Sequence, residues 1–131
     1  MTEFSGLELA QPLLRAISDE GYNTPTPIQA KAIPPLLDGR DLLGVAQTGT
    51  GKTAAFALPT LHHLTQDGSK LQPMKPRALI LAPTRELAMQ IEKDAQTLVK
   101  HTPLSLLSIV GGMDYQKQQK RLHNEIIDIV V

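Results

Sequence analysis

The 131-residue sequence contains no cysteine, which excludes a disulfide framework and a thiolate metal site and is typical of a reducing compartment. It also carries no excess charge, because thirteen basic residues balance thirteen acidic ones. Broad electrostatic capture of nucleic acid or of a membrane is therefore not expected, and any phosphate binding must be local. No apolar run reaches the roughly 18 residues that a membrane helix needs, and the first residues lack a basic segment followed by an apolar one. We therefore expect a soluble, cytoplasmic protein of one domain.

Short apolar runs are present instead, and segments with a helical period separate them. The runs cover 41–46, 77–83, 104–110 and 126–131, and the helical segments cover 52–64, 84–101 and 113–123. Parallel strands need crossover connections of about this length, so the pattern predicts an α/β fold with a parallel sheet and helices on both faces. The run 104–110 also fits a buried helical turn, and this alternative stays open.

The segment before the first run has helix and loop signals. Apolar residues from Leu9 to Ile17 follow one helical stripe, and this helix should end at Gly21. The stretch GYNTPTP follows as a loop, because each residue before a proline is pushed out of the helical region. The next residues predict a short helix that is interrupted near Pro34 and Pro35 and ends around residue 39.

A glycine-rich stretch, AQTGTGKT, lies between the first apolar run and the helix after it. This is the position of a phosphate-binding loop, and nearly its pattern, with Ala46 in place of the first glycine. Gly49 and Gly51 let backbone N–H groups converge on phosphate oxygens, and the start of the helix adds its positive end. Lys52 would contact the β and γ phosphates, and Thr53 would offer a hydroxyl to Mg²⁺. The plainer alternative is a glycine-rich turn that caps a helix.

Gln29 is the candidate for recognising the base of a nucleotide. Its amide can both donate and accept, which matches the N7/N6 edge of adenine. An aromatic ring from Tyr22, or from Phe4 further upstream, would stack on the base; the chain has only two Tyr and two Phe. Taken alone, Gln29 also fits an exposed polar residue on a helix.

Four motifs occur together in a characteristic order and spacing. They are GYNTPTPIQ at 21–29 with Phe4 upstream, AQTGTGKT at 46–53, APTRELAMQ at 82–90, and a double glycine at 111 and 112. Together they resemble the N-terminal part of the first RecA-like domain of a DEAD-box ATP-dependent RNA helicase, in a style similar to bacterial RhlE-like members. The resemblance covers the whole chain and implies a partial RecA-like P-loop domain, with a Q motif at about 2–30 and an ATP-binding core at 31–131.

The resemblance also implies ligands and the residues that hold them. ATP and Mg²⁺ are the expected cofactors, with Lys52 and Thr53 as catalytic residues and Thr53 as a metal ligand through ATP. The residues expected to hold ATP are Phe4, Tyr22, Thr24, Gln29, Ala46, Gln47, Thr48, Gly49, Thr50, Gly51, Lys52 and Thr53. The residues expected to contact RNA are Pro83, Thr84, Arg85, Glu86, Gly111 and Gly112.

The expected RNA segment has a physical basis at Arg85. It lies where a strand ends and a helix begins, which is the side on which open α/β sheets bind ligands. A helix N-terminus with an arginine suits phosphate without reading bases, so single-stranded or duplex RNA would be bound independently of sequence. The alternatives are a surface ion pair between Arg85 and Glu86 and a simple strand-to-helix turn at the glycines.

The Asp-Glu-Ala-Asp string of that family does not occur in the sequence. Asp128 is no substitute, because it lies inside an apolar run rather than at the carboxyl end of a strand. We therefore expect a piece of a helicase, truncated before this motif, that binds nucleotide weakly and does not turn it over. Strands missing from the sheet would leave apolar faces uncovered, so the isolated residues should self-associate or belong to a larger folded body.

Other functions can be compared with the sequence. A GTPase would need Asn-Lys-x-Asp and an ABC-type ATPase would need Leu-Ser-Gly-Gly-Gln, and neither string occurs. A noncatalytic module that senses nucleotide or dimerises remains open. His62 and His63 are adjacent and would point about 100° apart on a helix, so we expect no metal site there.

Overall fold

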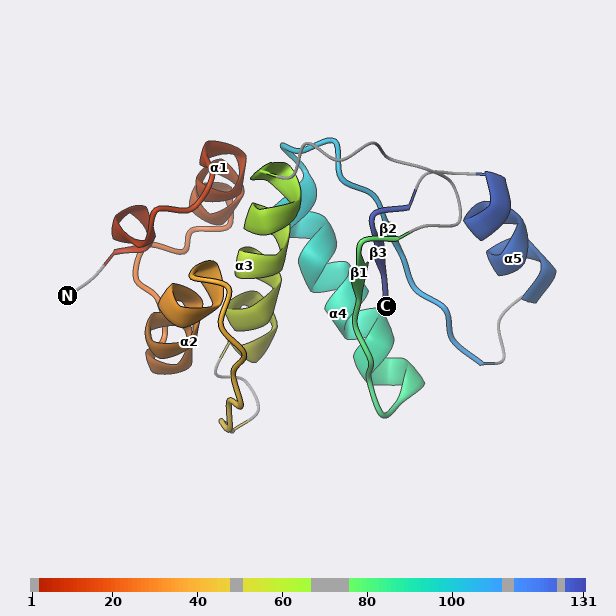
Figure 1. The fold of residues 1–131 in the computed structure, drawn as a ribbon, viewed down its shortest axis with the longest axis horizontal. Helices are drawn as coiled ribbons and strands as arrows, with labels where there is room; N and C mark the ends of the chain where they lie inside the picture. The colour runs from red at the N-terminus through yellow and green to blue at the C-terminus, as the bar shows by residue number, and fades with distance from the viewer. Residues whose placement is uncertain (1–2, 48–50, 67–75, 112–114, 125–126) are drawn as a thin grey trace.

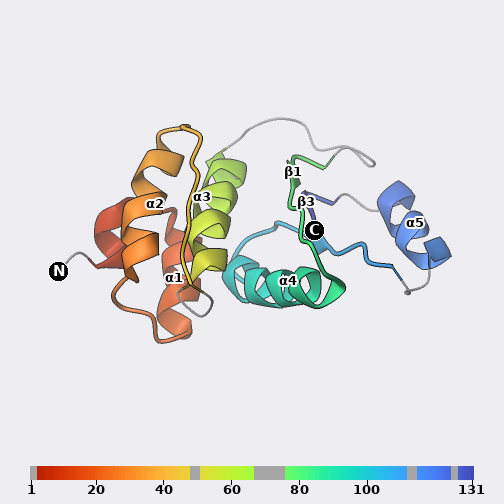
Figure 2. The ribbon, with the colours of Figure 1, turned by 90° about the horizontal axis from the view of Figure 1, so that it is seen from below.

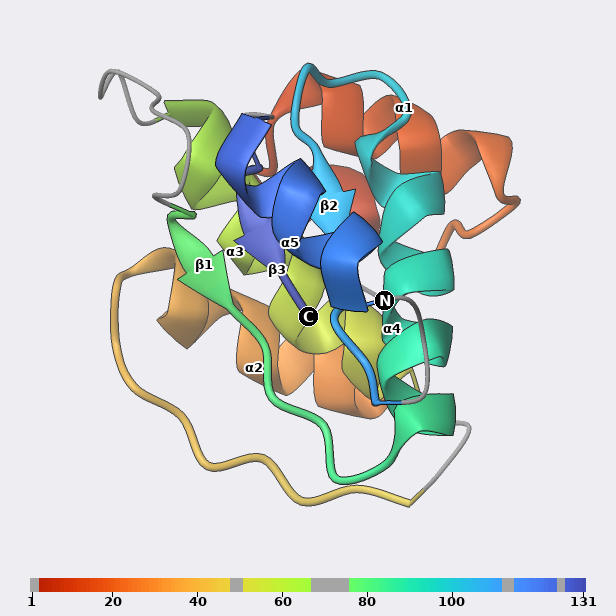
Figure 3. The same cartoon turned by 90° about the vertical axis from the view of Figure 1, so that its right-hand side faces the viewer.

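The computed structural model describes residues 3–47, 51–66, 76–111, 115–124 and 127–131 (Figure 1). In chain order the elements are η1 (Phe4–Leu7), α1 (Gln11–Asp19), α2 (Pro27–Leu37), α3 (Lys52–Gln66), β1 (Ala78–Leu79), α4 (Arg85–Val99), β2 (Leu106–Leu107), α5 (Tyr115–Asn124) and β3 (Ile129–Val130). Figure 3 shows α5 in front of the small sheet and α3 behind it. The expected α/β fold with helices on both faces is confirmed. Within the described ranges, no helix combines the length and the hydropathy needed to cross a membrane.

The described sheet is parallel and has the order β1-β3-β2. Ile129 at its centre pairs with Ala78 on one side and Leu106 on the other, and it is 1% exposed. The parallel sheet is therefore as predicted, although each strand has only two residues. Because Leu106–Leu107 pairs as a strand, the alternative of a helical turn in this run is wrong.

The apolar run at 41–46 does not form the predicted strand. Residues 41–47 have no regular secondary structure, and Leu43 and Val45 are 92% and 87% exposed. In Figures 1 and 2 this segment, which lies between α2 and α3 in the chain, lies away from β1. A strand needs a neighbour whose backbone groups pair with its own, and among the described residues β1 pairs with β3 alone. The prediction failed because apolar character does not reveal whether such a neighbour is present.

Helix α2 continues through Pro34 and Pro35 to Leu37, so the predicted interruption is wrong. Each proline removes one hydrogen bond to the carbonyl four residues earlier. Those carbonyls belong to Ala30 and Lys31, which are exposed, so water can replace the lost donors. The carbonyls of the prolines still accept bonds that close the last turn, from residues 38 and 40 at 3.2 and 3.1 Å.

The core lies mainly between α1, α3 and α4, with β2 and β3 packed against it. Apolar side chains at helical spacing provide it, as the periodicity predicted. The large apolar side chains that are fully buried are Leu13, Ile17, Ile33, Leu58, Leu61 and Ile129. Helix α3 contacts α1, α2 and α4, so the start of α3 is fixed by the packing of three neighbours.

Two adjacent histidines on α3 bind neighbouring backbone. The Ala10 N–H donates to His62 Nδ1 at 3.0 Å, which requires a ring nitrogen without a proton. Burial, and then the charge of His63, lowers the pKa of His62 and so favours this neutral ring. His63 Nε2 lies 2.8 Å from Leu36 O. The two rings therefore connect α3 to the residues before α1 and to α2.

Asp128 is 2% exposed and joins the amino ends of the three strands. Its Oδ1 lies 2.8 Å from Arg77 Nη2, and its Oδ2 accepts from the Ser105 N–H at 3.0 Å. The Asp128 carbonyl accepts from the N–H groups of Arg77 and Ala78 at 2.9 and 3.1 Å. This carboxylate is therefore committed to the fold, in agreement with its exclusion as a metal ligand.

Replacing this carboxylate should destabilise the chain strongly. Asp128→Ala would remove the buried carboxylate that pairs with the Arg77 guanidinium and accepts from the Ser105 N–H, so the free energy of unfolding should fall by about 3 kcal/mol. Urea denaturation followed by circular dichroism measures this change. The matched control is Asp41→Ala at an exposed position, which should change stability by less than about 0.5 kcal/mol. Similar values for both variants would contradict a structural role for the ion pair.

Candidate functional site

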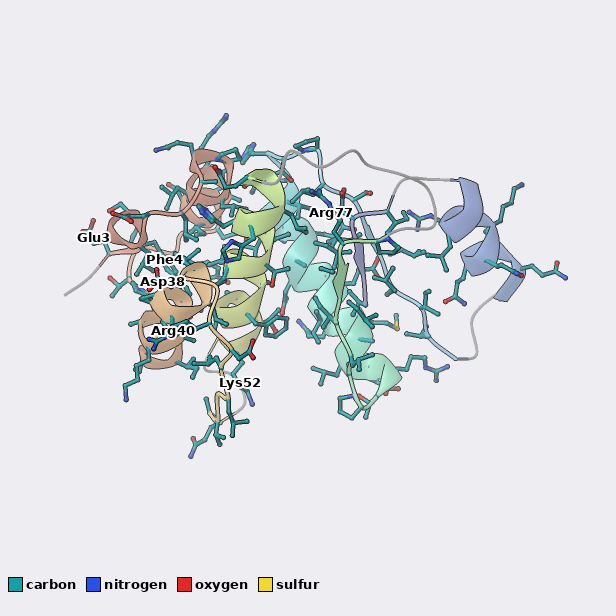
Figure 4. All side chains as sticks on the ribbon, viewed as in Figure 1. Glu3, Phe4, Asp38, Arg40, Lys52 and Arg77 are labelled. Carbon is teal, nitrogen blue, oxygen red and sulfur yellow. The ribbon has the colours of Figure 1, made fainter. Side chains whose placement is uncertain are left out.

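A cavity of about 1000 Å³ lies among the N-terminal segment, α2, the start of α3, the residues that follow β1, and α4. Most of the residues expected at a nucleotide site line it, although they come from segments far apart in the sequence. Those residues are Phe4, Tyr22, Thr24, Gln29, Gly51, Lys52 and Thr53. Figure 4 marks Phe4 beside α2 and Lys52 at the start of α3.

The rest of the expected nucleotide residues lie elsewhere or outside the described residues. Ala46 is half-buried and Gln47 is exposed, and neither lines the cavity. Thr48, Gly49 and Thr50 lie outside the described residues, so their expected role stays a prediction.

The start of α3 has the properties of an anion site. The helix begins at Lys52, directly after Gly51, and its first turn contains no acidic residue. The first N–H groups of a helix have no partner within the helix, and the aligned peptide dipoles make this end positive. Lys52 is exposed and Thr53 half-buried, so an ammonium group and a hydroxyl accompany these donors at the cavity.

Gln29 connects two parts of this site. Its backbone N–H lies 3.5 Å from Thr26 Oγ1, and its Oε1 accepts from the Thr26 N–H at 2.9 Å, so the two residues form a capping box at the start of α2. Its Nε2 donates to Gly51 O at 3.1 Å. Gln29 is 7% exposed, so the alternative of an exposed polar residue is wrong. The Thr-x-x-Gln capping pattern was visible in the sequence, but the link to Gly51 was not.

Gly51 is required by its own surroundings. Its φ of +84° lies in the left-handed region, which glycine adopts without steric cost. A Cβ at this position would overlap Gln29 Nε2 and would lie 3.1 Å from Gln29 Cδ and 3.2 Å from Thr26 Oγ1. The glycine therefore allows the Gln29 amide to approach the backbone immediately before α3.

The two aromatic candidates have different environments. Phe4 is 5% exposed and packs in the hydrophobic core, whereas Tyr22 is 56% exposed. Both line the cavity. Tyr22 is therefore the ring with a face available for a ligand, and Phe4 mainly supports the N-terminal segment.

The residues expected to contact RNA gather beyond the carboxyl ends of β1 and β2. The segment from Pro83 to Glu86 is exposed, and Thr84 Oγ1 accepts from the Leu87 N–H at 3.1 Å as the N-cap of α4. Arg85 Nη1 donates to Gly111 O at 3.1 Å, so the bond that the structure gives this guanidinium is not an ion pair with Glu86. Gly112 lies outside the described residues.

Gly111 differs from Gly51 in what surrounds it. Its φ lies outside the left-handed region, and a Cβ built there would meet no atom of the part of the chain that the structure describes within 4 Å. Neither the backbone nor the described packing therefore requires glycine at this exposed position, which is a turn between β2 and α5, so the alternative of a simple strand-to-helix turn stays open at 111.

Comparison with known proteins identifies relatives of the whole chain. The chain is 53% identical to the ATP-dependent RNA helicase SrmB of Escherichia coli, over 100% of this chain and 29% of that protein. It is 49% identical to the ATP-dependent RNA helicase RhlB of Pseudoalteromonas atlantica, over 99% of this chain and 30% of that protein. The chain therefore spans less than a third of the length of these relatives. They are named SrmB and RhlB, so an RhlE-like style stays a prediction.

Solved structures agree with this similarity. The RNA helicase Prp28 of Chaetomium thermophilum, bound to ADP, matches with a TM-score of 0.86 and 45% identity over 99% of this chain and 32% of that one. The yeast DEAD-box splicing factor Prp28 matches with a TM-score of 0.87 and 37% identity, over 100% and 32% of the two chains. These matches support a partial RecA-like fold. The model of the DEAD/DEAH box helicase family matches residues 26–131, which is most of the sequence, and the chain therefore belongs to this family.

Proposed function

We propose that this chain is the nucleotide-binding part of a cytoplasmic ATP-dependent RNA helicase, which as a whole hydrolyses ATP in the presence of RNA and separates short duplexes. The observation that carries the proposal is that one cavity brings Gln29 of α2 together with Gly51 and Lys52 at the start of α3. The relatives named as ATP-dependent RNA helicases support it. Residues 2–30 would form the base-recognition segment, and residues 31–131 would form the rest of the ATP-binding core.

The triphosphate of ATP would lie at the start of α3. Lys52 supplies a cation, and a first turn without acidic residues supplies N–H donors at the positive end of the helix dipole. The Thr53 hydroxyl is an oxygen ligand of the kind that Mg²⁺ accepts, alongside oxygens from the nucleotide and from water. When bound, ATP supplies the phosphoryl group that is transferred to water. Lys52 and Thr53 would hold that group and its metal in place.

Gln29 and Tyr22 would recognise adenine. A glutamine amide has two N–H donors and two acceptor lone pairs. The bonds to Thr26 and Gly51 use one of each, which leaves one donor and one acceptor for the N7/N6 edge of the base. The exposed ring of Tyr22, which also lines the cavity, would stack on the base.

The exposed segment of Pro83, Thr84, Arg85 and Glu86, together with Gly111 and Gly112, would contact the RNA backbone. Arg85 and the N-terminus of α4 provide donors and positive charge, although Glu86 in the first turn reduces the attraction for phosphate. Such contacts do not read bases, so single-stranded or duplex RNA would be bound independently of sequence.

The chain by itself would bind nucleotide without turning it over. Asp128, the carboxylate nearest the end of the sequence, belongs to a buried ion pair and is not available to a metal or to water. Leu43, Val45 and Leu81 are 92%, 87% and 83% exposed, which supports the proposal that further parts of a larger sheet would cover them in the whole protein.

The same exposed residues favour an alternative, in which the chain is a noncatalytic module that binds nucleotide and dimerises. Covering large apolar side chains would stabilise an association of copies. Sedimentation velocity over a range of protein concentrations measures this association. A monomer at every concentration would exclude the dimerising module and would also show that the exposed residues are tolerated without a partner.

Lys52→Ala should weaken ATP binding by about 1.5–3 kcal/mol, because a hydrogen bond to a charged group is lost. Titration with a fluorescent ATP analogue measures the change in Kd. Lys93→Ala, at an exposed position on α4, is the matched control and should leave the Kd unchanged. Equal Kd values for the wild type and Lys52→Ala would remove the phosphate site from the start of α3.

Gln29→Ala should reduce the preference for ATP over GTP by roughly 1–3 kcal/mol, because a paired contact with the base edge is lost. Competitive displacement of the fluorescent analogue by each nucleotide measures the preference, with Gln96→Ala on the exposed face of α4 as control. Equal binding of ATP and GTP by the wild type would refute adenine recognition. If Gln29→Ala loses equal affinity for ATP and for GTP, Gln29 acts only by holding the Gly51 backbone and does not recognise the base.

A further inference from the structure

Side chains from two helices hold the backbone that follows β2. The Ile109 N–H donates to Val131 O at 2.9 Å and so still takes part in the parallel pairing with the β3 side of the sheet. The Val110 N–H instead donates to Gln118 Oε1 at 3.0 Å, and Gln118 Nε2 lies 3.5 Å from Val110 O. The next carbonyl, that of Gly111, accepts from Arg85. Helices α5 and α4 thus each fix one of two successive residues.

At Val110 the Gln118 amide makes the backbone hydrogen bonds that a neighbouring strand would otherwise make. It offers one carbonyl and one NH₂ group, the same kinds of acceptor and donor as a peptide unit, and it directs them to both backbone groups of one residue. Gln118 is half-buried, whereas Gln116 and Gln119 on the same helix are exposed. Among the three glutamines of α5, the structure therefore gives this backbone contact to Gln118.

The position that is held in this way is exposed. Among the described residues, no atom lies within 4 Å of a Cβ built at Gly111. Beside it lie the Arg85 guanidinium, which has further N–H groups besides the one donated to Gly111, and the start of α4. An anionic backbone placed here would meet cationic and N–H donors at a surface whose shape is already set.

We propose that Gln118 is a positioning residue of the RNA site: it holds Val110 and Gly111 beside Arg85, so that the RNA backbone meets an ordered surface. The inference rests on the proposed function of the Arg85 and Gly111 segments in RNA binding. A surface that is ordered before binding loses less conformational entropy when the ligand binds, so Gln118 raises RNA affinity without touching RNA. Nucleotide binding at the start of α3 does not depend on it.

Gln118→Met tests this role, because methionine keeps the length of the side chain and removes both hydrogen bonds to Val110. The control is Gln116→Met on the exposed face of the same helix. We expect faster hydrogen exchange of the Val110 amide in Gln118→Met and a Kd for fluorescein-labelled oligouridine that is about three- to tenfold higher at fixed salt, as for lost hydrogen bonds. The Kd for ATP should not change in either variant.

A second variant separates positioning from general damage. Gln118→Glu keeps an acceptor for the Val110 N–H, so the exchange of this amide should stay slow. Oligouridine binding and Val110 exchange that are the same in Gln118→Met and Gln116→Met would overturn the inference, and so would an equal loss of ATP and oligouridine affinity. A wild type that binds ATP but not oligouridine would instead refute the proposed RNA function, and this inference with it.

Discussion

The hydrogen bond from Gln29 Nε2 to Gly51 O, at 3.1 Å, is the interaction on which the candidate nucleotide site depends. The same amide caps α2 through its oxygen, so the start of α2 and the residue before α3 are fixed relative to each other. Helix α3 packs against α1, α2 and α4, and its first residue is Lys52. The core therefore determines where a cation, a positive helix end and a base-recognition candidate meet, and the cavity lies at that point.

Gly51 and Gly111 differ in a way that separates folding from binding. Gly51 cannot carry a side chain, because Gln29 and Thr26 lie against it and its φ is +84°. Gly111 has neither restriction, and its carbonyl is held by Arg85. A glycine that the chain requires points to internal positioning, whereas a glycine in open space leaves room for an external ligand. The proposed nucleotide site thus depends on a contact inside the chain, and the proposed RNA surface depends on space beside Gly111 that the described residues leave open.

Local patterns in the sequence predicted the helices and the parallel sheet, because periodicity and crossover length are properties of short segments. The run at 41–46 has the same apolar character as the paired runs, but its pairing depends on a neighbour elsewhere, and here it is exposed. The Q-motif and phosphate-loop residues were predicted to act together, and the cavity does bring Gln29 and Lys52 together. The bonds from Gln29 to Gly51 and from Gln118 to Val110 were missed, since no local pattern specifies which backbone group a distant amide will contact.

The central claim is that the Gln29–Gly51 link and the start of α3 form one nucleotide site. The most direct measurement is a titration of the ¹⁵N-labelled chain with ATP and Mg²⁺, followed through the backbone amides and the side-chain amide of Gln29 in two-dimensional NMR spectra. The account predicts that the signals of Gly51, Lys52, Thr53 and the Gln29 side chain shift together, with a single apparent Kd. Two results would contradict it: signal shifts confined to other parts of the chain, or a shift of the Lys52 signal while the Gln29 side-chain signal stays unchanged.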